Sequence, residues 1–155
     1  MTGGEYVEGR HGPVRAPPAR CIAALLLRRR RRRELREVRE THGDAGVDAI
    51  FRGIAGRAAS KAKDKVTAAE PEARVAQLTE VLCDSGVMAE YSLIDGGFAL
   101  HEHTCPYSSV AKDNPEVCSV IHHVMDETLG GDHVQTASLA HGDRECRFEL
   151  TNIKK

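Results

Sequence analysis

Apolar residues recur at helical spacing in the first half of the orderly part of the chain. From Asp44, a typical N-cap residue, apolar side chains follow every three or four positions and predict a helix to about Lys65. Pro71 is well suited to the first position of a second helix, where its missing N–H costs nothing, and Ser85-Gly86 is expected to end that helix. Two helices are therefore expected before any strand.

The second half changes to the alternating pattern that is typical of strands. Asp95-Gly96-Gly97 is a hairpin-turn signal, and Pro115 opens a helix that is expected to end at Gly130. Four strands are predicted, over residues 87–94, 98–104, 133–140 and 145–151. The predicted fold is α+β: two N-terminal helices followed by a small antiparallel sheet with one packed helix, in the order strand, strand, helix, strand, strand.

Charge divides the chain of 155 residues into two unlike parts. Residues 1–40 contain 11 Arg and 5 Glu and carry +6, whereas the remaining residues carry −7. We interpret residues 1–40 as a disordered or atypical basic arm, although residues 22–40 could also form a helix, and residues 41–155 as the folded domain. A basic arm of this kind could bind DNA phosphates, or it could be a solvated charged segment. No apolar run is long enough to span a membrane, so we expect a cytoplasmic protein with no membrane partner.

Cysteine and histidine are concentrated after residue 100, which holds three of the five Cys and six of the eight His. Cys105, Cys118 and Cys146 are separated by 12 and 27 residues, unlike the short knuckles of a zinc ribbon. Strand geometry could place His101, His103 and Cys105 on one face. Soft thiolates select iron–sulfur clusters or zinc, but three buried core cysteines fit the spacing equally well.

Four segments of the second half carry a resemblance to a known family. They are Asp95-Gly96-Gly97-Phe98, His103-Thr104-Cys105-Pro106-Tyr107, Pro115-Glu116-Val117-Cys118, and His141-Gly142-Asp143 with Cys146. This pattern resembles the C-terminal sensor region of SufR-type regulators, which belong to the ArsR-like group of winged helix-turn-helix repressors. The resemblance implies that Cys105, Cys118 and Cys146 hold an iron–sulfur cluster, expected to be [4Fe–4S], whose gain or loss changes DNA affinity.

The resemblance leaves the fourth cluster ligand open. Some relatives carry a fourth Cys at the position of His101, so His101 or the neighbouring His103 could serve, as could a bound thiol or water. The resemblance also implies a homodimer and a DNA-binding helix-turn-helix before the sensor region. Only about 40 residues precede Thr41, which is too few for that domain. We interpret residues 12–33 as a frameshifted or mis-started gene model whose true frame resumes near Glu34.

The function predicted from the sequence is that of a sensor region, not of an enzyme. No nucleophile–base pair, phosphate-binding loop or paired-carboxylate motif stands out. We expect a cluster-binding sensor region of a transcriptional repressor linked to iron–sulfur cluster assembly or to redox or iron status. The alternatives are a zinc-binding structural or sensor domain, and a small-ligand module whose cysteines are incidental.

Overall fold

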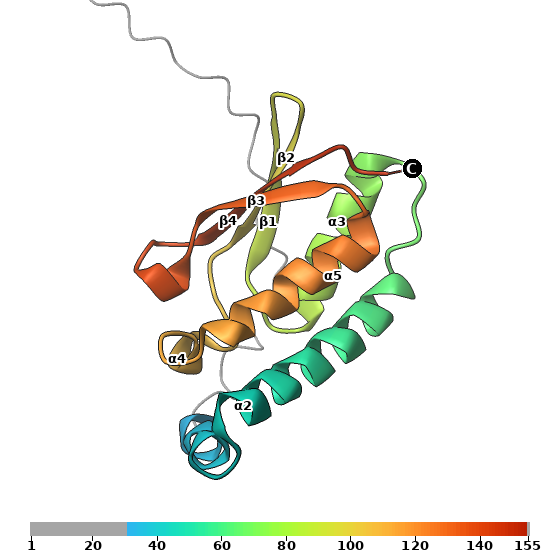
Figure 1. Ribbon diagram of the computed structural model, residues 1–155. Helices are drawn as coiled ribbons and strands as arrows, with labels where there is room; N and C mark the ends of the chain where they lie inside the picture. The colour runs from blue at the N-terminus through green and yellow to red at the C-terminus, as the bar shows by residue number, and fades with distance from the viewer. Residues whose placement is uncertain (1–30, 155) are drawn as a thin grey trace, which may run out of the picture.

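The computed structural model of the chain describes residues 31–154, which form one α+β domain (Figure 1). Most of the basic arm expected over residues 1–40, including Cys21, lies outside the described residues. The elements follow in the order α2 (Arg31–Lys63), α3 (Pro71–Asp84), β1 (Ala89–Ile94), β2 (Gly97–Glu102), α4 (Ser108–Ala111), η2 (Pro115–Cys118), α5 (Ser119–Leu129), β3 (Asp132–Ala137), η3 (Leu139–His141) and β4 (Cys146–Thr151).

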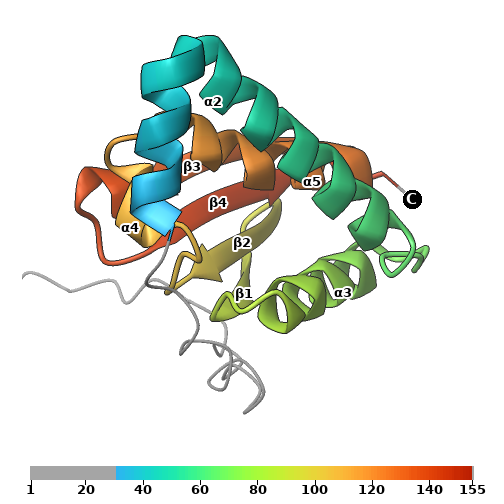
Figure 2. The same cartoon turned by 90° about the horizontal axis from the view of Figure 1, so that it is seen from below.

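The sheet is antiparallel and has the order β1-β2-β4-β3. Helices α3 and α5 lie against one face of it, and the long helix α2 packs along α5 (Figures 1 and 2). The predicted α+β fold, with one helix between two strand pairs, is therefore confirmed. Within the described residues, no helix combines the length and the apolar character needed to cross a bilayer.

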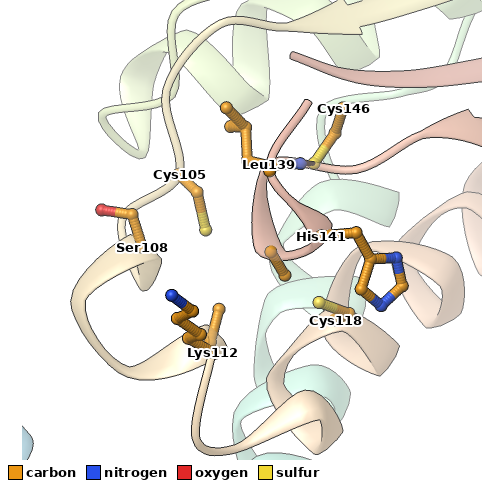
Figure 3. Close-up of a pocket in the computed structure, with 10 residues that line it drawn as sticks. Cys105, Ser108, Lys112, Cys118, Leu139, His141 and Cys146 are labelled. Carbon is orange, nitrogen blue, oxygen red and sulfur yellow. Dashed lines mark hydrogen bonds between the residues drawn. The ribbon is translucent and has the colours of Figure 1, made fainter. Parts of the chain in front are cut away.

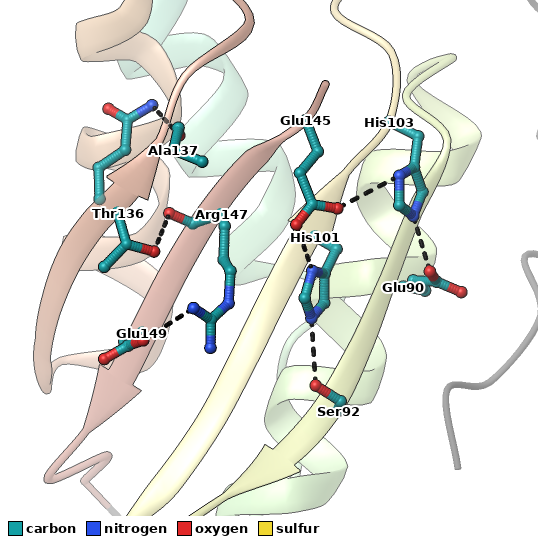
Figure 4. A network of polar contacts seen from close by, with 10 residues as sticks. Glu90, Ser92, His101, His103, Thr136, Ala137, Glu145, Arg147 and Glu149 are labelled. Atoms are coloured by element: carbon teal, nitrogen blue, oxygen red, sulfur yellow. Dashed lines mark hydrogen bonds and ion pairs between the residues drawn. The ribbon is translucent and has the colours of Figure 1, made fainter. Parts of the chain in front are cut away.

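The face of the sheet under the helices carries the main core. Alternation along the strands turns Leu100, Phe148 and Leu150 inward, where each is at most 1% exposed. They meet the inner faces of the helices, including Leu78 of α3 and Met125 of α5. The opposite face of the sheet has no helix among the described residues and carries a polar network instead (Figure 4).

Helix α2 bends sharply at Gly43, whose φ of 65° and ψ of −170° are not helical. The positive φ favours glycine, and a new helical segment starts at Asp44, as the sequence predicts. The first segment nevertheless belongs to the folded domain. Leu35 and Val38 pack against a second apolar cluster that contains Phe51. Apolar packing onto the domain therefore begins within residues 34–40, before the boundary that the charge pattern predicts.

Three short elements surround the candidate site: the single turn α4 and the two 3-10 segments η2 and η3. The helix predicted to open at Pro115 begins there as η2, whereas α4 and η3 were not predicted from the sequence. Segments of three or four residues are too short to show an apolar period. Because they connect the ends of β2, α5, β3 and β4, they determine where the cysteines lie.

Candidate functional site

The three cysteines with regulator-like spacing line one cavity of about 230 Å³ (Figure 3). Cys105 lies in the loop after β2, Cys118 ends η2, and Cys146 begins β4. Figure 3 shows their sulfur atoms facing a common space from three different segments. The rest of the wall is formed by Ser108, Ala111, Lys112, Leu139, Ala140, His141 and Gly142. The structure therefore brings together residues that are up to 41 positions apart in the sequence.

Each cysteine is positioned by regular structure next to it. Cys146 is paired directly across from Glu102 in the β2–β4 register, so both side chains lie on the helix-covered face. Cys118 lies at the junction of η2 and α5. The η2 segment itself begins at Pro115. Cys105 precedes Tyr107, whose ring packs edge-on against Phe51 of α2. All three positions are thus anchored to the core.

Backbone N–H groups point at two of the three sulfur atoms. The N–H of Tyr107 donates to Sγ of Cys105 at 3.3 Å, and the N–H of Leu139 donates to Sγ of Cys146 at 3.4 Å. All three thiols are free of disulfide bonds. A donor aimed at sulfur favours the thiolate, which is the form that binds metals. The site therefore supplies two preformed stabilising contacts to thiolate ligands.

Burial opposes ionisation of the same thiols. It raises the pKa of Cys105 to about 11, with the charges of Glu102, Cys146 and Cys118 adding to the effect. Burial also raises the pKa values of Cys118 and Cys146, and the charge of Glu102 contributes to both. Without a bound cation the three groups are therefore held as thiols at neutral pH. A metal must displace their protons to bind.

Glu102 is an unusual neighbour for this site. Its side chain is 6% exposed, and burial raises its pKa to about 8. The part of the chain that the structure describes offers its carboxyl no hydrogen bond or ion pair. A buried carboxyl is costly in its charged form, so burial favours the neutral acid at Glu102, beside the thiols.

The three cysteines and their neighbours do not form a binding site for a single metal ion as they are placed. Among the described residues, no three Cys, His, Asp or Glu side chains are close enough to surround one ion as they stand. One zinc ion needs its ligand atoms within about 2.3 Å of the same point. The three thiols instead border a cavity of about 230 Å³, which leaves room between them.

The structure does not bring His101 or His103 to this cavity. His101 is paired with Arg147 in the β2–β4 register, and this pair faces away from the helices (Figure 4). Its Nδ1 lies 3.0 Å from Oε1 of Glu145, and its Nε2 lies 3.1 Å from Oγ of Ser92. The expectation that strand alternation could place His101 beside Cys105 fails because β2 ends at Glu102 and the chain turns before Cys105.

His103 is held on the same outer side of the sheet as His101. Its Nε2 lies 2.7 Å from Oε1 of Glu90, and its Nδ1 lies 3.4 Å from Oε2 of Glu145. The two imidazole rings stack nearly parallel with centroids 6.3 Å apart. These histidines therefore belong to a polar network on the open face of the sheet.

Two residues near the thiols were not identified as site residues from the sequence. His141 lines the cavity, although the sequence signals it only as part of the His141-Gly142-Asp143 segment. Glu102 reads as an ordinary polar position of a strand. Its inward orientation follows from the register with Cys146, which sequence spacing alone does not give. Cys83 does not line this cavity and is 1% exposed in the main core.

Comparison with known proteins places the domain in one family. The model of the family described as "Methanogen output domain 1" matches residues 60–151, a span that contains every cysteine and histidine of the cavity. No curated protein matches the chain, and no solved structure does. Since the match covers more than half of its length, the chain belongs to the methanogen output domain 1 family.

Proposed function

We propose that this domain is the sensor region of a transcriptional regulator and that it binds an iron–sulfur cluster through Cys105, Cys118 and Cys146. The observation that carries the proposal is the convergence of these three thiols on one cavity. The spacing alone was equally compatible with three unrelated core cysteines. Convergence on a single cavity favours a common ligand, because scattered core cysteines have no reason to face the same space.

The chemistry of the cavity fits an iron–sulfur cluster. Thiolates are the usual ligands of such clusters, and hydrogen bonds to their sulfur atoms tune them. Two backbone N–H groups already donate to sulfur atoms here. Apolar side chains of Ala111 and Leu139 line the same space and limit the access of water. A bound cluster would supply one-electron redox chemistry or a lability that reports on iron or oxidants.

The separation of the thiols favours a cluster over zinc. A zinc ion would require the three segments to close until their sulfur atoms share one centre. A polynuclear cluster is larger, so it can bridge ligands that no single ion could reach together. Zinc binding remains the second candidate because the same soft donors would accept it.

The segments that hold the thiols are suited to pass a signal from the occupied cavity to the rest of the domain. One cluster would tie the loop after β2, the η2–α5 junction and the start of β4 to each other. The η2 segment also contacts the first part of α2, since Arg39 donates to Glu116 at 3.2 Å. The family description as an output domain agrees with a module that passes on a signal. Action on DNA, through a homodimer and a helix-turn-helix domain outside this chain, is part of the proposal that rests on the SufR resemblance.

The test is anaerobic reconstitution with ferrous iron and sulfide, followed by iron and sulfide analysis and visible spectroscopy. We expect a brown protein with a broad visible absorption and about equal amounts of iron and acid-labile sulfide. The matched control is the triple variant Cys105→Ser, Cys118→Ser, Cys146→Ser. A colourless protein that takes up zinc in place of the cluster supports the second candidate, since zinc has no visible band of this kind.

A further inference from the structure

We propose that His141 is the fourth protein ligand of the cluster. This inference rests on the proposed function and identifies the residue that completes the same site. Three cysteines leave one coordination position of a four-ligand cluster without a protein thiolate. The nitrogen of a neutral imidazole is a suitable donor for iron at that position.

Hydrogen bonds hold the turn that carries His141 next to Cys146. His141 ends η3, and its N–H donates to the carbonyl of Ser138 at 3.0 Å. The carboxylate of Asp143 accepts a hydrogen bond from the N–H of Ser138 at 2.7 Å and closes the turn from its other end. The same turn supplies Leu139, whose N–H points at Cys146. A turn that already contacts one thiolate ligand is thus well placed to contribute another donor.

The imidazole of His141 is available for ligation. His141 lines the cavity together with the three cysteines, and Figure 3 shows its ring next to Cys118, on the side away from Cys105. Its side chain is exposed, and within residues 31–154 its ring has no hydrogen bond or ion pair. No existing interaction must therefore be broken for a ring nitrogen to bind iron.

The other donors are less suitable. His101 and His103 lie on the opposite face of the sheet and are held by carboxylates. Lys112 also lines the cavity, but its ammonium group has no lone pair to offer. The hydroxyl of Ser108 is a weaker ligand for iron than an imidazole. Among the cavity residues other than the cysteines, His141 is the one whose side chain carries an imidazole nitrogen.

The proposed fourth ligand differs from the three thiols in its exposure. The three thiols are half-buried or buried, whereas His141 is exposed. A small oxidant or an iron chelator would therefore approach the site from the side of His141.

The experiment uses the full chain with histidine-specific ¹⁵N labelling, reconstituted anaerobically and then reduced to a paramagnetic state. Pulsed EPR detects nitrogen bound directly to iron, and the label shows whether that nitrogen comes from histidine. We expect a strong histidine coupling in the unmodified protein, its loss in His141→Ala and His141→Cys, and its retention in His101→Ala and His103→Ala. His141→Cys should keep the full iron content, because it replaces one ligand by another.

Two results would overturn the inference. One is a protein that holds the cluster but shows no histidine coupling. The other is a coupling that persists unchanged in His141→Ala. Either result leaves the proposed function intact, because the cluster is still present on the three cysteines. A protein that binds no iron and sulfide at all would instead remove the proposed function, and with it the basis for assigning a fourth ligand.

Discussion

The guanidinium of Arg39, in the first segment of α2, donates to Oε1 of Glu116 at 3.2 Å. Glu116 lies two residues before Cys118, inside the same 3-10 segment. Within residues 31–154, the other carboxylate oxygen of Glu116, Oε2, is buried without a hydrogen-bond partner. The contact between Arg39 and Glu116 joins the segment before the Gly43 bend to the element that carries a proposed ligand. It offers a direct route by which occupancy of the cavity could affect the N-terminal part of the domain.

Arg39→Ala should uncouple these two parts. In the unmodified protein, cluster loading is expected to slow hydrogen exchange in residues 34–42, because a fixed η2 holds the partners of Arg39 in place. In Arg39→Ala the cluster should still bind, but this additional protection should largely disappear. Hydrogen exchange measured by mass spectrometry, with and without the cluster, provides the comparison.

Arg52→Ala is the matched control for this prediction. Arg52 lies on the same helix and pairs with Asp48, one turn away, at 3.0 Å. Among the described residues it makes no ion pair with η2, so the response to the cluster should be unchanged. Equal protection of residues 34–42 in Arg39→Ala and the unmodified protein would show that the signal does not pass through this contact.

Glu102 should make the cluster-free protein less stable as the pH rises. Its pKa is about 8 in the folded state, against 4.5 for an ordinary glutamate, so the folded protein binds the extra proton between these values. The contribution of the protonated Glu102 to the free energy of unfolding is therefore fully present below about pH 4.5. It is lost as the pH rises towards 8. The upper limit of the slope is about 1.4 kcal/mol per pH unit for one group.

Replacing Glu102 by Gln removes the charge and should flatten this dependence. Urea unfolding of the cluster-free protein at pH 5 and pH 8 measures it, and the gain of Glu102→Gln over the unmodified protein should be larger at pH 8. Glu149→Gln is the control, since Glu149 lies on the open face of the sheet and pairs with Arg147 at 3.0 Å. The same gain at both pH values would mean that Glu102 is not buried as a neutral acid.

The thiol of Cys105 should be slow to react in the cluster-free protein. Only the thiolate is nucleophilic, and burial raises the pKa of Cys105 to about 11. Alkylation by iodoacetamide, followed at Cys105 by peptide mass spectrometry, should therefore keep accelerating above pH 9. Glu102→Gln removes a nearby negative charge and should shift this profile to lower pH. A rate that is already constant near pH 8 would contradict the predicted environment.

The fold was predictable because its long elements have clear periods. The helix from Pro71, the hairpin at Gly96 and the four strands all appear close to the expected positions, with shifts of one to three residues at most ends. The packing of residues 34–40 was not expected. The arginine-rich charge pattern of residues 1–40 hid the few apolar positions, Leu35 and Val38, that pack onto the domain.

The site was predictable only in part. The three cysteines could be identified from spacing and resemblance, but their convergence also depends on α4 and η3, which are too short to leave a pattern. The placement of His101 failed for a related reason. Alternation assigns faces only while a strand continues, and β2 ends at Glu102, three residues before Cys105. The short turn of η3 then brings His141 to the cavity from a distant part of the sequence.

The central claim is that Cys105, Cys118 and Cys146 hold one cluster together, and iron content tests it most directly. Each single replacement by Ser, reconstituted in parallel with the unmodified protein, should lose most of its iron, sulfide and visible absorption. Cys83→Ala should keep them, because Cys83 lies in the main core and does not line the cavity. Full iron and sulfide content in all three serine variants, or a loss in Cys83→Ala as complete as in Cys105→Ser, would contradict the account.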